Sequence, residues 1–133
     1  MNELYDKIRH SGGGYFSESE IDTFIQFISK WEKHIISGFY QITQAGDKAR
    51  LEFGAHAGPM LIDVVVEKGH VSVCMLPISQ ISLIRLEEIG DTTHLVIEGT
   101  SNQTVLSYVA ATEDFRVDLR KYWDYLQSLL SNR

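Results

Sequence analysis

The hydrophobic positions of the chain change their spacing twice along its length. Between residues 18 and 33, apolar side chains recur every three or four positions, the period of a helix buried on one side. From residue 35 to 110 they alternate with polar side chains, as in strands with one buried face. Helical spacing returns over residues 113–130. The pattern predicts an α+β domain with a helix on each side of a set of strands.

The helix predicted over residues 18–33 has a clear start. Ser17 and Glu20 form the Ser-x-x-Glu pattern of a capping box, in which each side chain accepts a hydrogen bond from the other residue's backbone. Its apolar stripe consists of Ile21, Phe24, Ile25, Ile28 and Trp31. This stripe requires a partner surface.

The first fourteen residues form a separate segment. Residues 1–10 favour a short helix with Leu4, Tyr5 and Ile8 on one side. Ser11 and three consecutive glycines, Gly12 to Gly14, then interrupt it. Because glycines uncouple neighbouring segments, we predict that residues 1–14 are a flexible arm.

Seven strands are expected between residues 35 and 110. Their ranges are 35–44, 48–55, 60–67, 70–76, 80–88, 92–99 and 103–110, and the turns between them contain Gly46, Gly58, Gly69, Gly90 and the pair Ser101-Asn102. Connections this short favour antiparallel neighbours. The expected fold is therefore a strongly bent antiparallel sheet or small barrel of about seven strands.

Two hairpins have a register that the faces of their strands predict. A turn at Lys68-Gly69 places only apolar side chains on one face, namely Ile62, Val64, Val66, Val71, Val73 and Met75. The opposite face, expected to meet solvent, holds Asp63, Glu67, His70, Ser72 and Cys74. A turn at Gly90-Asp91 likewise sets Leu86 opposite Leu95 and Ile84 opposite Ile97. A slip of one residue would mix the faces of either hairpin.

The last helix is predicted over residues 113–130, with Thr112 as its N-cap and two acids in its first turn. Its apolar stripe consists of Phe115, Leu119, Tyr122, Trp123, Leu126, Leu129 and Leu130. We expect this stripe to close the apolar sheet face that carries Val64, Val66, Val71 and Val73.

Length and composition limit the classes of function. The chain has 133 residues, which suits a single domain, and a formal net charge of -6. None of the three segments 1–33, 34–111 and 112–133 has more bases than acids, so nucleic acids and anionic membranes are not expected partners. The single cysteine, Cys74, excludes an intramolecular disulfide. The N-terminus lacks a signal-peptide pattern, so we expect a cytoplasmic protein.

The side chains that could take part in catalysis are not spaced as an active site requires. His70 and His94 lie near Glu67 and Glu87, and we expect cross-strand polar pairs there rather than a metal site or a general base. Cys74 and His70 share a face roughly 13 Å apart, too far for a nucleophile and its base. Asp63 opposite Cys74 would raise the pKa of the thiol. We therefore expect no enzyme, no cofactor and no metal site.

The order of seven antiparallel strands and one amphipathic helix resembles a pleckstrin-homology-like (PH-like) domain over residues 35–130. Two stretches resemble bacterial members of that superfold: Leu76-Pro77-Ile78-Ser79-Gln80-Ile81-Ser82-Leu83-Ile84 and Ser107-Tyr108-Val109-Ala110-Ala111-Thr112-Glu113-Asp114. The helix over 18–33 is an addition to the superfold. The resemblance implies a bent sandwich or barrel, and it implies no single function, because members bind lipids or peptides or are structural.

Lipid-binding members carry bases around the first hairpin, where this chain has Lys48 and Arg50. These are the candidates for an anion site, but Asp47 and Glu52 flank them and make a poor phosphate cradle. We therefore expect a non-enzymatic interaction module that binds a protein segment or itself, by burying an apolar groove or adding a strand. The alternatives are a small acidic dimeric chaperone and an α+β enzyme with a pocket between helix and sheet.

Overall fold

A computed structural model describes residues 1–100 and 103–132 of the chain. Three α-helices and seven strands follow one another as the sequence predicts, and the predicted turn at Ser101-Asn102 lies outside the described residues. The helices are α1 (Asn2–Gly12), α2 (Glu18–Ser29) and α3 (Glu113–Ser131). The strands are β1 (Ile35–Ala45), β2 (Lys48–Ala57), β3 (Met60–Glu67), β4 (His70–Pro77), β5 (Ile81–Ile89), β6 (Thr92–Gly99) and β7 (Thr104–Ala110).

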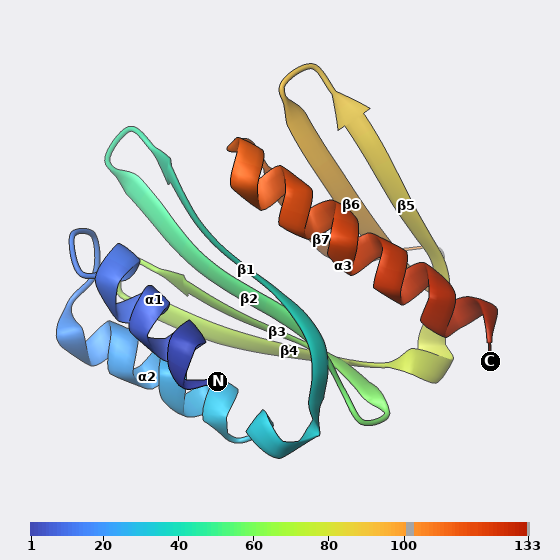
Figure 1. Cartoon of the computed structure of the whole chain (residues 1–133), viewed down its shortest axis with the longest axis horizontal. Helices are drawn as coiled ribbons and strands as arrows, with labels where there is room; N and C mark the ends of the chain where they lie inside the picture. The colour runs from blue at the N-terminus through green and yellow to red at the C-terminus, as the bar shows by residue number, and fades with distance from the viewer. Residues whose placement is uncertain (101–102, 133) are drawn as a thin grey trace.

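The strands form two antiparallel sheets, with the orders β1-β2-β3-β4 and β5-β6-β7. Both predicted hairpin registers are confirmed: Val64 pairs with Val73 across one turn, and Ile84 pairs with Ile97 across the other. Gly69 and Gly90 have φ values of 73° and 57° in these turns, a conformation that favours glycine. The seven strands do not close into a barrel, so the α+β class is confirmed and the barrel alternative is wrong. Figure 1 shows the two sheets splayed apart, with α3 beside the second one.

The β1–β4 sheet is covered on both faces. We call the packing against α1 and α2 the α2-side core; it contains Ile8, Phe16, Ile21, Phe24, Ile25, Ile28, Tyr40, Leu51, Phe53, Ala55, Ala57, Ile62, Val64 and Val66. We call the packing on the other face the α3-side core; it contains Phe39, Leu61, Leu76, Ile81, Leu95, Ile97, Leu106, Tyr108, Ala110, Leu119, Tyr122 and Leu126. The β1–β4 sheet is therefore the middle layer of the molecule (Figure 1).

This arrangement corrects two expectations. The face with Val64, Val66, Val71 and Val73 packs into the α2-side core, not against α3. The face predicted to meet solvent is instead covered at its inner end by the α3-side core, so Asp63 is 8% exposed and Leu61 and Leu76 are buried. An alternating pattern tells which residues share a face, and it does not tell which helix covers that face.

The helices begin where the sequence predicts and end differently. The capping box of α2 is present: the Glu20 amide donates to the Ser17 hydroxyl, and Glu20 accepts from the Ser17 amide. α2 ends at Ser29, four residues before the predicted end, and a short 3-10 turn over Glu32–His34 leads into β1. Thr112 is the N-cap of α3, but its side chain makes no capping hydrogen bond.

The first residues form the helix α1, which continues to Gly12. Ile8 is fully buried in the α2-side core, and the Ser11 hydroxyl lies 2.5 Å from that of Tyr40. The Lys7 ammonium stands 5.9 Å from the centre of the Tyr40 ring, and Arg9 pairs with Asp22 of α2. α1 thus packs on the sheet at one side of β1, while its mobility stays a prediction.

Candidate functional site

The two sequence-predicted site residues, Lys48 and Arg50, line one hollow at the tip of the β1–β2 hairpin. The hollow measures about 590 Å³, and the β3–β4 turn forms its other side. Its lining is Thr43, Ala45, Asp47, Lys48, Ala49, Arg50, Glu67 and Lys68. It therefore combines three cations with two acids and the methyl groups of small side chains.

Arg50 lies on the face of the β1–β4 sheet that also carries Glu52 and Glu67, and its guanidinium pairs with both carboxylates. Its Nη1 donates to Glu67 Oε1 at 2.8 Å and its Nη2 donates to Glu52 Oε2 at 3.0 Å. Glu52 is 3% exposed, whereas Glu67 lies at the open rim. With both carboxylates in place, the guanidinium offers little charge to an added phosphate. That Lys48 and Arg50 make a poor phosphate cradle stays a prediction.

A smaller hollow of about 230 Å³ adjoins the first and shares Thr43 and Arg50 with it. Gln41 lies at this junction between the two sheets. Its Nε2 donates to Glu52 Oε1 at 3.0 Å and to the carbonyl of Val109 on β7 at 3.1 Å. Because both partners are acceptors, the orientation of the amide is determined by its surroundings. Gln41 thus joins the two sheets by one side chain.

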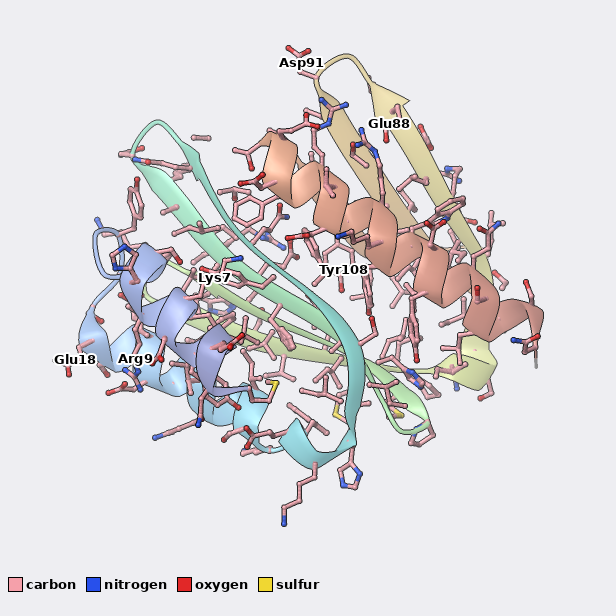
Figure 2. All side chains as sticks on the ribbon, viewed as in Figure 1. Lys7, Arg9, Glu18, Glu88, Asp91 and Tyr108 are labelled. Carbon is pink, nitrogen blue, oxygen red and sulfur yellow. The ribbon has the colours of Figure 1, made fainter. Side chains whose placement is uncertain are left out.

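Asp63 lies deeper on the same face of β3 and is the buried site residue that the sequence analysis placed in solvent. Gly54 stands opposite it on β2 and Cys74 opposite it on β4. The ring of Tyr108 reaches across from β7 and sets its hydroxyl against the backbone of Gly54. Figure 2 marks Tyr108 in the space between α3 and the β1–β4 sheet.

Burial raises the pKa of Asp63 to about 7, and the nearby negative charge of Glu52 acts in the same direction. The Tyr108 phenol and the Arg50 guanidinium lower it by less. The Tyr108 hydroxyl lies close to Asp63, yet neither it nor Asp63 Oδ1 has a hydrogen-bonding partner of normal geometry within the described residues. A signal for this burial existed in the sequence, because Asp63 is the only charged residue within the apolar run from Met60 to Val66.

The other candidate groups form no reactive pair. His94 shares a hydrogen bond of 2.8 Å with the Thr92 hydroxyl, and Glu67, opposite His70, is bonded to Arg50. Burial raises the pKa of the Cys74 thiol and the charge of Asp63 adds to this, as expected from their predicted pairing. Such a thiol is a poor nucleophile at neutral pH.

His56, which the sequence analysis did not single out, is buried beside α3. Its Nε2 donates to the Gly58 carbonyl at 2.7 Å, so its Nδ1 accepts from the Tyr125 hydroxyl at 2.6 Å. Both ring nitrogens are therefore used within the protein. Across residues 1–100 and 103–132, no three His, Cys, Asp or Glu side chains are placed to hold a metal ion. None of the described helices is long and apolar enough to cross a membrane.

No protein-family model matches this chain, and no curated protein or solved structure compared with it matches either.

Proposed function

We propose that the chain is a non-enzymatic, cytoplasmic PH-like interaction module that binds a segment of a partner protein. The proposed site is the hollow at the β1–β2 tip. The observation that carries this proposal is its lining, in which charges of both signs alternate with the small side chains of Thr43, Ala45 and Ala49. A peptide segment also combines apolar groups, backbone amides and charges, whereas a phosphate ligand would favour bases alone. The volume lies within the range of ligand sites, roughly 300–1,000 Å³.

The backbone beside the hollow supports the same proposal. β1 pairs with β2 alone among the described strands, and its last residues, Gln44 and Ala45, are exposed. A strand edge next to side-chain hollows is the arrangement used when an extended peptide adds to a sheet. The partner's backbone would pair with the end of β1, and its side chains would enter the hollow.

The proposal is tested by selecting short random peptides on the immobilised protein and measuring the affinity of those enriched. Ala45→Trp fills the hollow from an exposed position and should weaken binding at least tenfold. Ser128→Trp, on the exposed face of α3, is the matched control and should bind as the wild type does. Failure to enrich any peptide, or equal binding by both variants, would refute the proposed site.

Two further outcomes separate the alternatives. With its net charge of -6, the protein should not sediment with phosphoinositide vesicles at physiological salt. If the wild type does sediment with the vesicles and Lys48→Glu does not, the ligand of this site is a lipid headgroup and not a peptide. A stable dimer in light scattering, together with no peptide binding by the monomer, would favour the chaperone alternative.

A further inference from the structure

The five buried polar or charged residues among those described are Gln41, Glu52, His56, Asp63 and Thr93. All five lie on the α3 side of the molecule. Gln41 bonds to β7, His56 to Tyr125 of α3, and Thr93 to Arg116 of α3, while Glu52 bonds to Gln41. The α2-side core consists of hydrophobic residues. A change of protonation in the interior would therefore act on one side of the β1–β4 sheet.

Asp63 is the one carboxyl among the five whose oxygen, Oδ1, is buried without a hydrogen-bonding partner among the described residues; Gln41 Oε1 is also without one, but an amide does not ionise. The hydroxyls of Tyr108 and Tyr122, whose pKa values are raised by burial and by the charge of Asp63, are likewise buried without a partner. Tyr108 belongs to β7 and Tyr122 to α3, so the carboxyl faces both elements that pack on this side of the sheet. For an ionised carboxylate here, the Tyr108 phenol and the Arg50 guanidinium compensate for less than its burial costs.

Among the charged groups around Asp63, Glu52 opposes its ionisation more than Arg50 favours it. β2 contributes Glu52 and Arg50, and the guanidinium is shared between Glu52 and Glu67. β4 contributes Cys74, and β7 and α3 contribute Tyr108 and Tyr122. The second buried carboxylate, that of Glu52, is already paired with Arg50. A charge on Asp63 would therefore add a third carboxylate near a guanidinium that already binds two.

We propose that Asp63 is a proton-controlled switch of the contact between the β1–β4 sheet and the unit formed by β5–β7 and α3. With the carboxyl protonated, the two units pack as in the structure. Loss of the proton loosens that contact and leaves α1 and α2 on their sheet. This proposal does not rest on the binding proposed at the hairpin hollow.

The pH range follows from the raised pKa of Asp63, which is about 7 in the folded protein. An ordinary aspartate releases its proton near pH 4, so the unfolded chain ionises first as the pH rises. The stabilisation from the protonated carboxyl is thus complete at acid pH and is lost as the pH rises toward and through 7. Between pH 5 and pH 8 the equilibrium for loosening should increase on the order of ten- to a hundredfold.

Hydrogen exchange at pH 5 and pH 8, corrected for the intrinsic pH dependence of exchange, tests the switch on the wild-type chain. Amides of β7 and α3 should lose protection at the higher pH by that factor, and amides of α2 should not. Equal loss in α2 and α3, or no loss in either, would overturn the proposal. This comparison needs no variant to fold.

A variant series then assigns the effect to Asp63. Asp63→Asn should abolish the loss of protection in α3, whereas Glu67→Gln, a change on the same face at the open rim, should retain it. His56 and Glu52 remain in Asp63→Asn, so a pH dependence that persists in this variant would assign the switch to another group and refute the proposal.

Discussion

At the scale of single residues, Gly54 and Tyr108 determine how closely the two sheets approach. A Cβ at position 54 would lie 2.7 Å from Tyr108 Cζ and nearer still to the hydroxyl oxygen. Tyr108 is 1% exposed and touches the rings of Phe39 and Tyr122 edge-on, so it has little room to move. We predict that Gly54→Ala lowers the free energy of unfolding by about 1–3 kcal/mol, measured by urea unfolding.

The clash can be separated from the backbone effect of alanine. Gly14→Ala is the matched control, because a Cβ there meets nothing within 4 Å, and it should leave stability nearly unchanged. Tyr108→Phe removes the atom nearest to the added Cβ. The double variant Gly54→Ala, Tyr108→Phe should therefore be less destabilised than the sum of the single variants. Strict additivity would show that the contact does not carry the effect.

At the scale of elements, α3 contributes the centre of the α3-side core through Leu119, Tyr122 and Leu126. Phe115 and Trp123 are only partly buried at its margin. Leu119→Ala should cost about 2–5 kcal/mol, since the side chain is fully buried and leaves a cavity. Val117→Ala, on the exposed side of the helix, should change stability by less than about 0.5 kcal/mol. Similar losses in chemical denaturation for both variants would contradict the packing of α3.

The same helix is fastened to β5 and β6 by a cluster around Glu88, which Figure 2 marks on β5. Its carboxylate accepts from Arg120 at 2.8 Å, from Thr93 at 2.7 Å and from Arg116 at 3.1 Å. The hydrogen bonds from Arg120 and Thr93 are the main cause that lowers the pKa of Glu88 to about 2. Because the folded pKa is depressed, this stabilisation is present above the ordinary pKa and is lost as the pH falls toward 2.

We therefore predict that acidification from pH 5 to pH 2 lowers the melting temperature of the wild type more than that of Glu88→Gln. Glu87→Gln is the control, since the neighbouring Glu87 is bonded to Arg85 on the same strand. That variant should follow the wild-type curve. Parallel acid curves for Glu88→Gln and the wild type would show that the cluster contributes no pH-dependent stability.

Two features of α1 have opposite effects on its mobility: the glycines at its end favour local opening, and its buried side chain opposes it. Gly12 is the last residue of α1 and Gly13 and Gly14 follow it, whereas Ile8 anchors α1 in the α2-side core. We predict that local opening at the glycines is easier than opening of the central strand, so residues 3–9 should exchange their amide hydrogens faster than residues 62–66. Equal protection in the two segments would show that the Ile8 anchor outweighs the glycine joint.

At the scale of the whole molecule, the β1–β4 sheet separates two cores of different chemistry. The α2-side core is hydrophobic, and the α3-side core borders all five buried polar residues that are described. Because buried polar groups depend on specific partners, the α3 side is the one whose packing responds to protonation. The hairpin hollow opens beside this polar side, so the proposed binding site and the proposed switch lie on the same face of one sheet.

The sequence by itself determined the local structure of this protein. Capping residues and turn glycines act on their immediate neighbours, and alternation sorts side chains between two faces, so the capping box at Ser17, the strand ranges and both hairpin registers could be predicted. The sequence pattern also predicted that Lys48 and Arg50 lie on the same hairpin. Only the tertiary structure decided what covers each face: α1 and α2 took the valine face, and β7 and α3 took the face with Asp63. Burial is the main cause of the pKa of about 7 for Asp63, and the charge of Glu52 is the second. This burial involves β7 and α3, whose Tyr108 and Tyr122 stand more than forty positions away in the chain, and periodicity carries no information about contacts at that distance.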